Sequence, residues 1–405
     1  MSWPIIKLGN ICRIELGKTP SRANKKYWDE SKTSDNTWLS IADMPLSTKP
    51  VISNSKEYIS NEGAKLCKIV PKDTLIVSFK LSLGRLAFTG RNLYTNEAIA
   101  ALYINDENTV LKDYLYWYLT FFDWDVAAGS DIKVKGKTLN KAKLKEIDIP
   151  LPSILEQKYI VTILDQAFVE IEQVRDKTEL NLKNSRELFE SYLHQIFSTN
   201  GDGWIETTLG QEIDLLTGFA FKSKEYVTHS NSIPLIRGDN VVQGALRWAG
   251  VKLWPKESIS EYEKYLLQEN DIVLAMDRTW VKAGMKFSKI TATDLPALLV
   301  QRVARIRSLN NVDSNYLYHV IGSKQFEDYV LSIQTGLGVP HISGKQIQAF
   351  KFSKPNLECQ KVIVKTMDYL SIEIEQLTGI YQSKLLALSE LKKSILQKAF
   401  AGELK

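Results

Sequence analysis

The sequence predicts an α+β protein in which two β-rich domains alternate with two long helices. Residues 155–197 contain neither Pro nor Gly and are rich in Leu, Ile, Glu, Gln and Lys, a composition that favours a long helix. The same pattern returns 203 residues later, where Gln360-Lys361 aligns with Gln157-Lys158. The segments before the two helices also correspond, with Trp204 matching Trp3 at an offset of 201. The repeat therefore predicts a duplicated unit, each copy a domain followed by a helix.

Apolar residues in both stretches follow an alternating spacing of three and four residues, which predicts a coiled-coil seam. At 1.5 Å per residue each helix would be roughly 60 Å long. Two equal helices in one chain can pair antiparallel about a pseudo-two-fold axis, and pairing with another copy of the chain is the alternative. The predicted seam consists of Ile160, Leu164, Ile171, Val174 and Leu188 in the first helix, and Ile363, Met367, Leu370, Ile374, Leu377, Leu388 and Leu391 in the second.

The chain divides on this basis into domain 1–152, helix 153–200, domain 201–352 and helix 353–405. Short β-type runs at 38–41, 74–79 and 98–104 lie between Pro, Gly, Asn and Ser, and 111–120 is helix-like. Pro150 and Pro152 end the first domain, because proline disfavours continuation of a regular element. Gly201-Asp202-Gly203 starts the second.

Composition indicates an ordinary globular protein, with 44% hydrophobic and 24% charged residues. The net charge of +5 allows an anionic partner without requiring one, since 52 basic residues nearly match 47 acidic ones. Three cysteines lie far apart and predict neither disulfides nor a zinc site, so a reducing cytoplasm is expected. We expect no signal peptide from the N-terminal residues and no membrane span from the apolar window 114–124, which is too short.

Catalytic signatures are missing from the sequence. Gly17-Lys18-Thr19 resembles the end of a P-loop, but the glycine that the motif requires is Cys12 here. Glu156-Gln157-Lys158 has a nuclease-like form without the partnering acidic residue, and a solvated helix face is the better explanation. The four histidines show no metal-ligand spacing, and no glycine-rich cofactor loop of a methyltransferase is present.

The chain resembles the specificity subunit (HsdS family) of type I restriction-modification systems over its full length. The resemblance rests on the order of two variable domains and two similar helices, together with short local motifs. These motifs are Trp3 with Leu8-Gly9, Thr19-Pro20-Ser21, Ser78-Phe79 with Leu83-Gly84-Arg85, Ala275-Met276-Asp277, Val339-Pro340-His341-Ile342, and Gln397-Lys398-Ala399-Phe400 with Gly402-Glu403-Leu404. The polar stretch at Thr178, Asn181 and Ser185 in the first helix departs from the family's usual apolar seam.

The resemblance implies a DNA-binding subunit that has no active site of its own. Each domain would be a target recognition domain for one half of a bipartite sequence in double-stranded DNA. The helices would set the gap and dock two methylation subunits, which carry S-adenosylmethionine and methylate adenine at N6. Restriction subunits that use ATP and Mg²⁺ would complete the complex. We therefore expect no cofactor and no metal on this chain.

Base contacts need polar side chains on loops that reach the major groove. The family framework does not identify them, and a solvated surface residue is the simpler interpretation of each. His341 is equally consistent with a turn-stabilising role. The candidates are Lys18, Thr19, Ser21, Arg22, Lys80 and Ser82 in the first domain, Lys222, Arg237, Asp239, Arg278, Lys282 and His341 in the second, and the phosphate-binding candidates Lys133, Lys135 and Lys137.

Three other functions stay open from the sequence. One is a non-catalytic adaptor whose β domains bind proteins while the helices oligomerise. Another is a specificity subunit of a related system in which methylation and cleavage share one polypeptide. The third is a nuclease with an unrecognised site, which no sequence feature supports.

Overall fold

A computed structural model describes residues 3–129, 132–133, 136–137, 139–198, 201, 203–335 and 339–404. The chain separates into two compact units, and both boundaries fall inside the long helices. The first unit is Met1–Glu179 with Gln382–Lys405, and the second is Leu180–Tyr381. Each unit therefore holds one β-rich domain and a part of each long helix.

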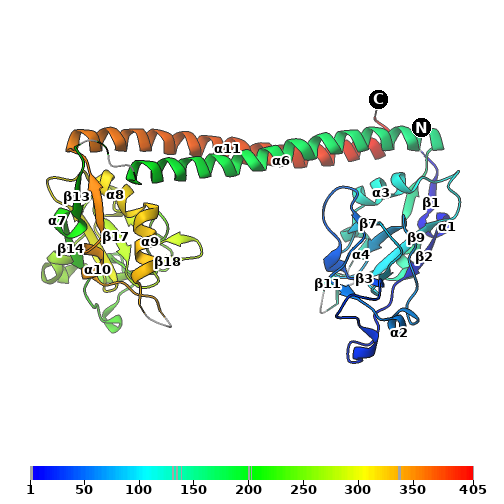
Figure 1. Ribbon diagram of the computed structural model, residues 1–405, viewed down its shortest axis with the longest axis horizontal. Helices are drawn as coiled ribbons and strands as arrows, with labels where there is room; N and C mark the ends of the chain where they lie inside the picture. Colours follow the sequence, from blue (N-terminus) through cyan, green and yellow to red (C-terminus); the bar gives the residue numbers. More distant parts are fainter. Residues whose placement is uncertain are drawn as a thin grey trace. The chain divides into compact units, whose positions relative to one another are not determined.

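The first unit is built on a sheet with the strand order β2-β9-β6-β7-β4. Strands β2, β9 and β7 of this sheet are labelled in Figure 1. A smaller sheet has the order β5-β3-β8, and β1 pairs with β12 where the domain begins and ends. Its strands are β1 (Ile5–Lys7), β2 (Cys12–Leu16), β3 (Thr37–Leu39), β4 (Val51–Ile52), β5 (Glu57–Tyr58), β6 (Leu75–Ser78), β7 (Leu86–Thr89), β8 (Tyr94–Thr95), β9 (Ile99–Ile104), β10 (Ile132–Lys133), β11 (Gly136–Lys137) and β12 (Asp148–Pro150). Its helices are α1 (Leu8–Ile11), η1 (Lys25–Tyr27), η2 (Ile41–Asp43), α2 (Asn61–Ala64), α3 (Lys112–Phe121), α4 (Trp124–Ala128) and α5 (Lys141–Lys145).

The second unit repeats this topology, except that its main sheet has no counterpart of β4 among the described residues. Its main sheet has the order β14-β22-β17-β20, its smaller sheet β16-β15-β21, and β13 pairs with β23. The strands are β13 (Ile205–Thr208), β14 (Ile213–Thr217), β15 (Ser232–Ile236), β16 (Lys252–Pro255), β17 (Ile272–Ala275), β18 (Trp280–Val281), β19 (Gly284–Met285), β20 (Phe287–Lys289), β21 (Leu298–Leu299), β22 (Val303–Ser308) and β23 (Lys351–Lys354). The helices are α7 (Leu209–Glu212), η3 (Ser223–Glu225), η4 (Lys256–Tyr265), η5 (Ala292–Asp294), α8 (Ser314–Ile321), α9 (Lys324–Ile333) and α10 (Gly344–Gln348). The predicted α+β class and the internal duplication are both confirmed.

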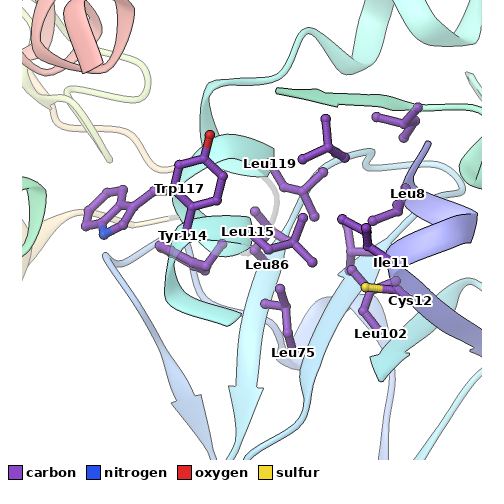
Figure 2. Packing of buried hydrophobic residues seen from close by; sticks show 14 of the residues in the cluster. Leu8, Ile11, Cys12, Leu75, Leu86, Leu102, Tyr114, Leu115, Trp117 and Leu119 are labelled. Atoms are coloured by element: carbon purple, nitrogen blue, oxygen red, sulfur yellow. The ribbon is translucent and has the colours of Figure 1, made fainter. Parts of the chain in front are cut away.

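Helix α3 covers one face of the main sheet in the first unit. Its side chains Leu115 and Leu119 are fully buried and belong to the same apolar cluster as Leu75, Leu86 and Leu102 from the strands (Figure 2). Burial of apolar area of this kind is the main favourable contribution to folding.

Two corresponding glycines are required by close backbone contacts. Gly17 follows β2 and Gly218 follows β14, and each donates its N–H to the carbonyl of a neighbouring strand segment, at 3.1 and 3.0 Å. A Cβ at Gly17 would lie 2.2 Å from the Thr95 carbonyl oxygen, and a Cβ at Gly218 would lie 2.3 Å from that of Val300. No other residue fits there without moving the backbone.

The long helices are α6 (Ile154–Ser198) and α11 (Leu357–Phe400), and they pack against each other within the chain. In the first unit, Lys392 of α11 pairs with Glu172 of α6 and lies 5.5 Å from the ring centre of Phe168. Phe400, eight residues further along α11, joins the core cluster that holds Ile160, earlier in α6. This register is antiparallel, so pairing within one chain is the arrangement observed.

The predicted seam shifts by one residue at several positions. Leu188 is 69% exposed, Leu391 45% and Leu377 36%, so these three side chains do not lie on the buried face. The neighbouring residues 189, 392 and 378 are less exposed. An α-helix has 3.6 residues per turn, so a strict 3.5-residue repeat drifts by about 20° per heptad relative to it. The buried face follows the helix rather than the ideal heptad.

Other predicted seam residues keep their place. Ile160, Leu164, Ile171 and Met367 are buried. Val174, Ile363, Leu370, Ile374 and Leu388 are partly buried. Part of the polar stretch of α6 forms hydrogen bonds within the helix. The hydroxyls of Thr178 and Ser185 donate to carbonyls of α6 at 2.7 and 3.0 Å.

A buried glutamine near the start of each long helix forms hydrogen bonds that attach the helix to its domain. Gln157 is 0% exposed, and its amide donates to the carbonyls of Thr109 and Pro152, both at 2.9 Å. Its Oε1 accepts from the N–H of Leu111 at 2.9 Å. Gln360 repeats the arrangement, since it donates to the Pro355 and Asn311 carbonyls and accepts from the Asp313 N–H at 2.9 Å.

Replacing either glutamine by alanine should lower the free energy of unfolding by about 1–3 kcal/mol, because buried backbone groups lose their partners. Chemical denaturation of Gln157→Ala and Gln360→Ala would measure this. Gln166→Ala is the matched control, since Gln166 is exposed on α6 and should change stability by less than about 0.5 kcal/mol. Equal effects at Gln157 and Gln166 would contradict the role of the buried amide.

At corresponding positions, the two units use different side chains to contact the long helix. In the first, Trp117 Nε1–H donates to Asp165 at 2.7 Å. In the second, His319 Nε2 lies 3.6 Å from Asp368. Burial lowers the pKa of His319 below its usual value, although the nearby carboxylate of Asp368 acts in the opposite direction.

The lowered pKa of His319 predicts acid sensitivity. Below about pH 6.5 the unfolded histidine takes up a proton that the folded one does not. The unfolded state then binds more protons, so this contribution to stability is present above pH 6.5 and is lost as the pH falls. Denaturant unfolding of His319→Gln should show a weaker decline between pH 7 and pH 5 than the native chain, whereas His229→Gln, at an exposed position, should not. Parallel pH profiles of all three proteins would refute it.

Candidate nucleic-acid interface

Three turns of the second unit meet at the end of strand β17. The N–H of Met276, just after this strand, donates to the Arg302 carbonyl at 2.8 Å, and its carbonyl accepts from the Ile342 N–H at 2.9 Å. The next turn residue, Arg278, donates its N–H to the Pro340 carbonyl at 2.7 Å. These backbone bonds fix the side chains of three separate sequence segments beside one another.

The side chains Asp277, Arg302 and His341 form a cluster at this junction. His341 Nδ1 lies 2.6 Å from Asp277 Oδ1, and Arg302 Nη1 lies 3.5 Å from His341 Nε2. Arg302 Nε is 3.7 Å from Asp277 Oδ2. Because a carboxylate only accepts and a guanidinium only donates, the neutral histidine with its proton on Nδ1 satisfies both neighbours.

A cleft of about 450 Å³ lies beside this cluster. It brings together the predicted residues Arg237, Asp239 and Arg278, which come from two distant stretches of sequence. Arg302 and Lys286 also line it. Burial lowers the pKa of Lys286, and the nearby cations Arg247 and Arg278 act in the same direction. Mixed cationic and acidic groups in a concave site can position polar base edges or phosphates.

The other predicted residues of this unit lie outside the cleft lining. Lys222 and Lys282 are both exposed, and neither lines the cleft. His341 is not a lining residue either. Its Nδ1 lies 2.6 Å from Oδ1 of Asp277, which does line the cleft.

In the first unit, Arg22 is held by its own domain. Its guanidinium stacks 4.0 Å from the ring centre of Trp28 and 4.9 Å from that of Trp38. Its Nη2–H donates to Glu57 at 2.9 Å, and Nη1 pairs with the other oxygen of the same carboxylate. Both terminal nitrogens are thus engaged, and the ion pair with Glu57 raises the pKa of Arg22. Arg22, Trp28 and Glu57 line a cleft of about 390 Å³.

The remaining candidates of the first unit are dispersed. The hydroxyl of Thr19 donates to Glu97, and the carbonyls of Lys18 and Ser21 accept from the Trp38 and Trp28 indoles at 3.1 and 3.2 Å. These bonds involve backbone oxygens of Lys18 and Ser21, whose side chains are exposed. The structure does not place Lys18, Thr19 or Ser21 in the lining of the Arg22 cleft.

Lys80 and Ser82 occupy the turn after β6, which corresponds to the turn after β17. The Lys80 ammonium lies 5.3 Å from the ring centre of Phe79, and the Ser82 carbonyl accepts from the Ser78 hydroxyl. Lys135 lies outside the described residues, as do the side chains of Lys133 and Lys137.

Sequence reasoning missed Arg302, Lys286, Trp28 and Glu57. Each is a single charged or aromatic residue without a spacing pattern of its own. Alignment of the two repeats gives a signal for Arg302 alone. The Phe79 N–H donates to the Ala98 carbonyl at 3.0 Å as Met276 does to Arg302, so Arg302 replaces an alanine.

Within the described ranges, no group of three or more His, Cys, Asp or Glu residues is arranged to hold a metal ion. Cys12, Cys67 and Cys359 are free thiols. None of the described helices is both long enough and apolar enough to cross a membrane.

Comparison with known proteins gives one consistent family. A family model described as the type I restriction modification DNA specificity domain matches residues 2–182 and 201–383. The chain is 24% identical over 418 residues to the type I restriction enzyme MjaVIII specificity subunit of Methanocaldococcus jannaschii, covering 100% of this chain and 93% of that protein. It is 37% identical over 171 residues to the EcoAI specificity subunit of Escherichia coli, an alignment that spans 42% of this chain and 28% of that relative.

Solved structures agree on the fold. The crystal structure of the HsdS subunit from Thermoanaerobacter tengcongensis aligns with a TM-score of 0.62 at 17% identity, covering 100% of this chain and 97% of that one. A chain from a structure described as showing complex assembly and conformational transition of the type I R-M system aligns with a TM-score of 0.75 at 16% identity, covering 100% and 98%.

Proposed function

Because the chain belongs to the family of type I restriction-modification DNA specificity subunits, we propose that each of its two β-rich domains recognises one half of a bipartite sequence in double-stranded DNA. The specificity subunit is the non-catalytic part of such an enzyme. The domain limits in this proposal are 1–152 and 201–352, with the intervening helix at 153–200 and the last at 353–405. Strand β23 extends to Lys354, so the functional segment of the second domain includes two more residues.

The observation that carries the proposal is one scaffold that presents different side chains at the same place. After the corresponding strands β6 and β17, the first unit has Lys80 and Leu81 where the second has Asp277 and Arg278. Leu81 and Arg278 share a left-handed backbone, with φ of 66° and 47°. Two copies of one framework with different polar groups suit recognition of two different half-sites.

The partners follow from the family. We infer that the two long helices set the gap between the half-sites and bind two methylation subunits, one for each repeat. Those subunits would supply S-adenosylmethionine and the N6-adenine methylation. Restriction subunits would supply ATP- and Mg²⁺-dependent translocation and cleavage. This chain's own residues serve to bind and orient the DNA.

Single-molecule methylome sequencing tests this function. The chain and its neighbouring methylation subunit are expressed together in a host that lacks adenine methylation. We expect N6-methyladenine at one split motif, and its loss when this chain is omitted. Methylation that is unchanged without this chain, or absent although both subunits are well expressed, would overturn the proposal and favour a protein-binding adaptor.

A further inference from the structure

The backbone at Arg302 is strained in a way that points to a function. Arg302 has φ of 68°, in the left-handed region that favours glycine, on the turn between β21 and β22. Its side chain is nevertheless 59% exposed. Arg278, on the neighbouring turn, also has a positive φ of 47°. Residues held in sparsely populated backbone conformations cluster at functional sites, and both arginines line the same cleft.

The side chain of Arg302 is braced on one side only. Its contacts to Asp277 and His341 involve Nε and Nη1, at 3.7 and 3.5 Å. A guanidinium has five N–H donors, so both donors on Nη2 and one on Nη1 are available. None of them has a protein partner among the described residues. An arginine whose guanidinium already lies beside protein partners loses less conformational freedom when it binds.

The free donors match guanine among the four bases. Guanine presents two acceptors, O6 and N7, on its major-groove edge, and bidentate pairing with arginine is the commonest specific contact. Adenine presents a donor, N6–H₂, at the place of O6, which would oppose the guanidinium. The cluster is also confined to one repeat, since Ala98 and Lys80 stand where Arg302 and Asp277 do.

We propose that Arg302 recognises a guanine in the half-site of the second domain, with Asp277 and His341 as positioning residues. The proposal rests on the function proposed above and specifies one base of one half-site. A phosphate contact is the competing role of an exposed arginine, and it would contribute affinity without base preference.

Methylome sequencing and binding titrations of Arg302→Ala test the proposal, with the complete complex of this chain and its methylation subunit. We expect one G·C position in one half-site to become degenerate, while the other half-site and the gap stay as in the native protein. In titrations, discrimination against a substitution at that position should fall by roughly tenfold to a hundredfold. Lys256→Ala, which removes a charge at an exposed position of the same domain outside the cleft lining, should leave the motif unchanged.

Asp277→Ala is a second variant, which keeps the proposal testable if Arg302→Ala fails to fold. It removes the brace and should relax the same guanine position less than Arg302→Ala does, whereas Asp277→Asn, which keeps an acceptor, should restore most of the preference. An unchanged motif in Arg302→Ala, or weaker binding to all sequences with no position relaxed, would overturn the proposal. Failure of the proposed function is distinguishable, because the native complex would then give no split motif at all.

Discussion

Exchange of residues 201–355 for the matching segment of another specificity subunit is expected to replace one half of the methylated motif completely. The other half should stay unchanged, because residues 3–129 and 139–152 would keep their own fold and contacts. The segment carries both β13 and β23, whose pairing from Ile205 with Lys354 closes the domain. An exchange that stopped at 352 would divide β23 and combine halves of a strand from different proteins.

The measurement is methylome sequencing of the native and exchanged proteins with the same methylation subunit. The reciprocal exchange of residues 1–152 is the control and should change the opposite half only. A change in both halves, or in neither, would contradict independent recognition by the two domains. The gap should be equal in all exchanges, because the long helices are retained in each.

Trp117→Ala is expected to lower the free energy of unfolding of the first unit by about 3–5 kcal/mol, the usual cost of removing a buried aromatic residue. Trp117 is 1% exposed, and its ring centre lies 4.4 Å from that of Phe168. Its indole N–H donates to Asp165, which also forms an ion pair with Lys49 at 2.6 Å. The alanine leaves a cavity between α3 and α6 and removes a hydrogen bond that orients the helix.

Denaturant unfolding followed by circular dichroism would measure this loss. Trp248→Ala is the comparison, since Trp248 is 39% exposed and its removal should cost clearly less than that of Trp117. Trp117→His provides an informative third protein, because His319 occupies the corresponding position of the second unit. Equal stability of the native protein and Trp117→Ala would show that the first unit does not depend on this contact.

The architecture was predictable because the sequence contains the unit of one domain and one long helix twice. The repeat at Gln157 and Gln360 locates both helix starts, and β-type runs at 74–79 and 98–104 are confirmed as β6 and β9 within one residue. The helix predicted at 111–120 is α3, displaced by one residue. The exact buried face of the helices was less predictable, because Leu188 and Leu391 follow an ideal heptad that the helix geometry does not keep.

The residues of the two clefts were predictable only in part. Arg237, Asp239 and Arg278 were chosen as polar loop residues able to reach base edges, and the fold places all three in the lining of one cleft. Arg22 satisfied the same criterion, yet tertiary partners distant in sequence occupy both of its terminal nitrogens. Arg302 stands where the first repeat has Ala98, but its neighbours His341 and Asp277 lie 39 and 25 residues away along the chain. Contacts of this kind depend on folding and leave no local pattern.

The glutamine joints have a consequence for how such chains diversify. Gln157 and Gln360 bond to main-chain atoms of their domains, and every partner is a peptide carbonyl or N–H. Main-chain atoms are the same in every sequence, so the joint imposes little restriction on which side chains the attached domain carries. The same joint can therefore hold domains of different sequence. Loop side chains of either domain can therefore change, or a whole domain can be exchanged, while the attachment to the helix is kept.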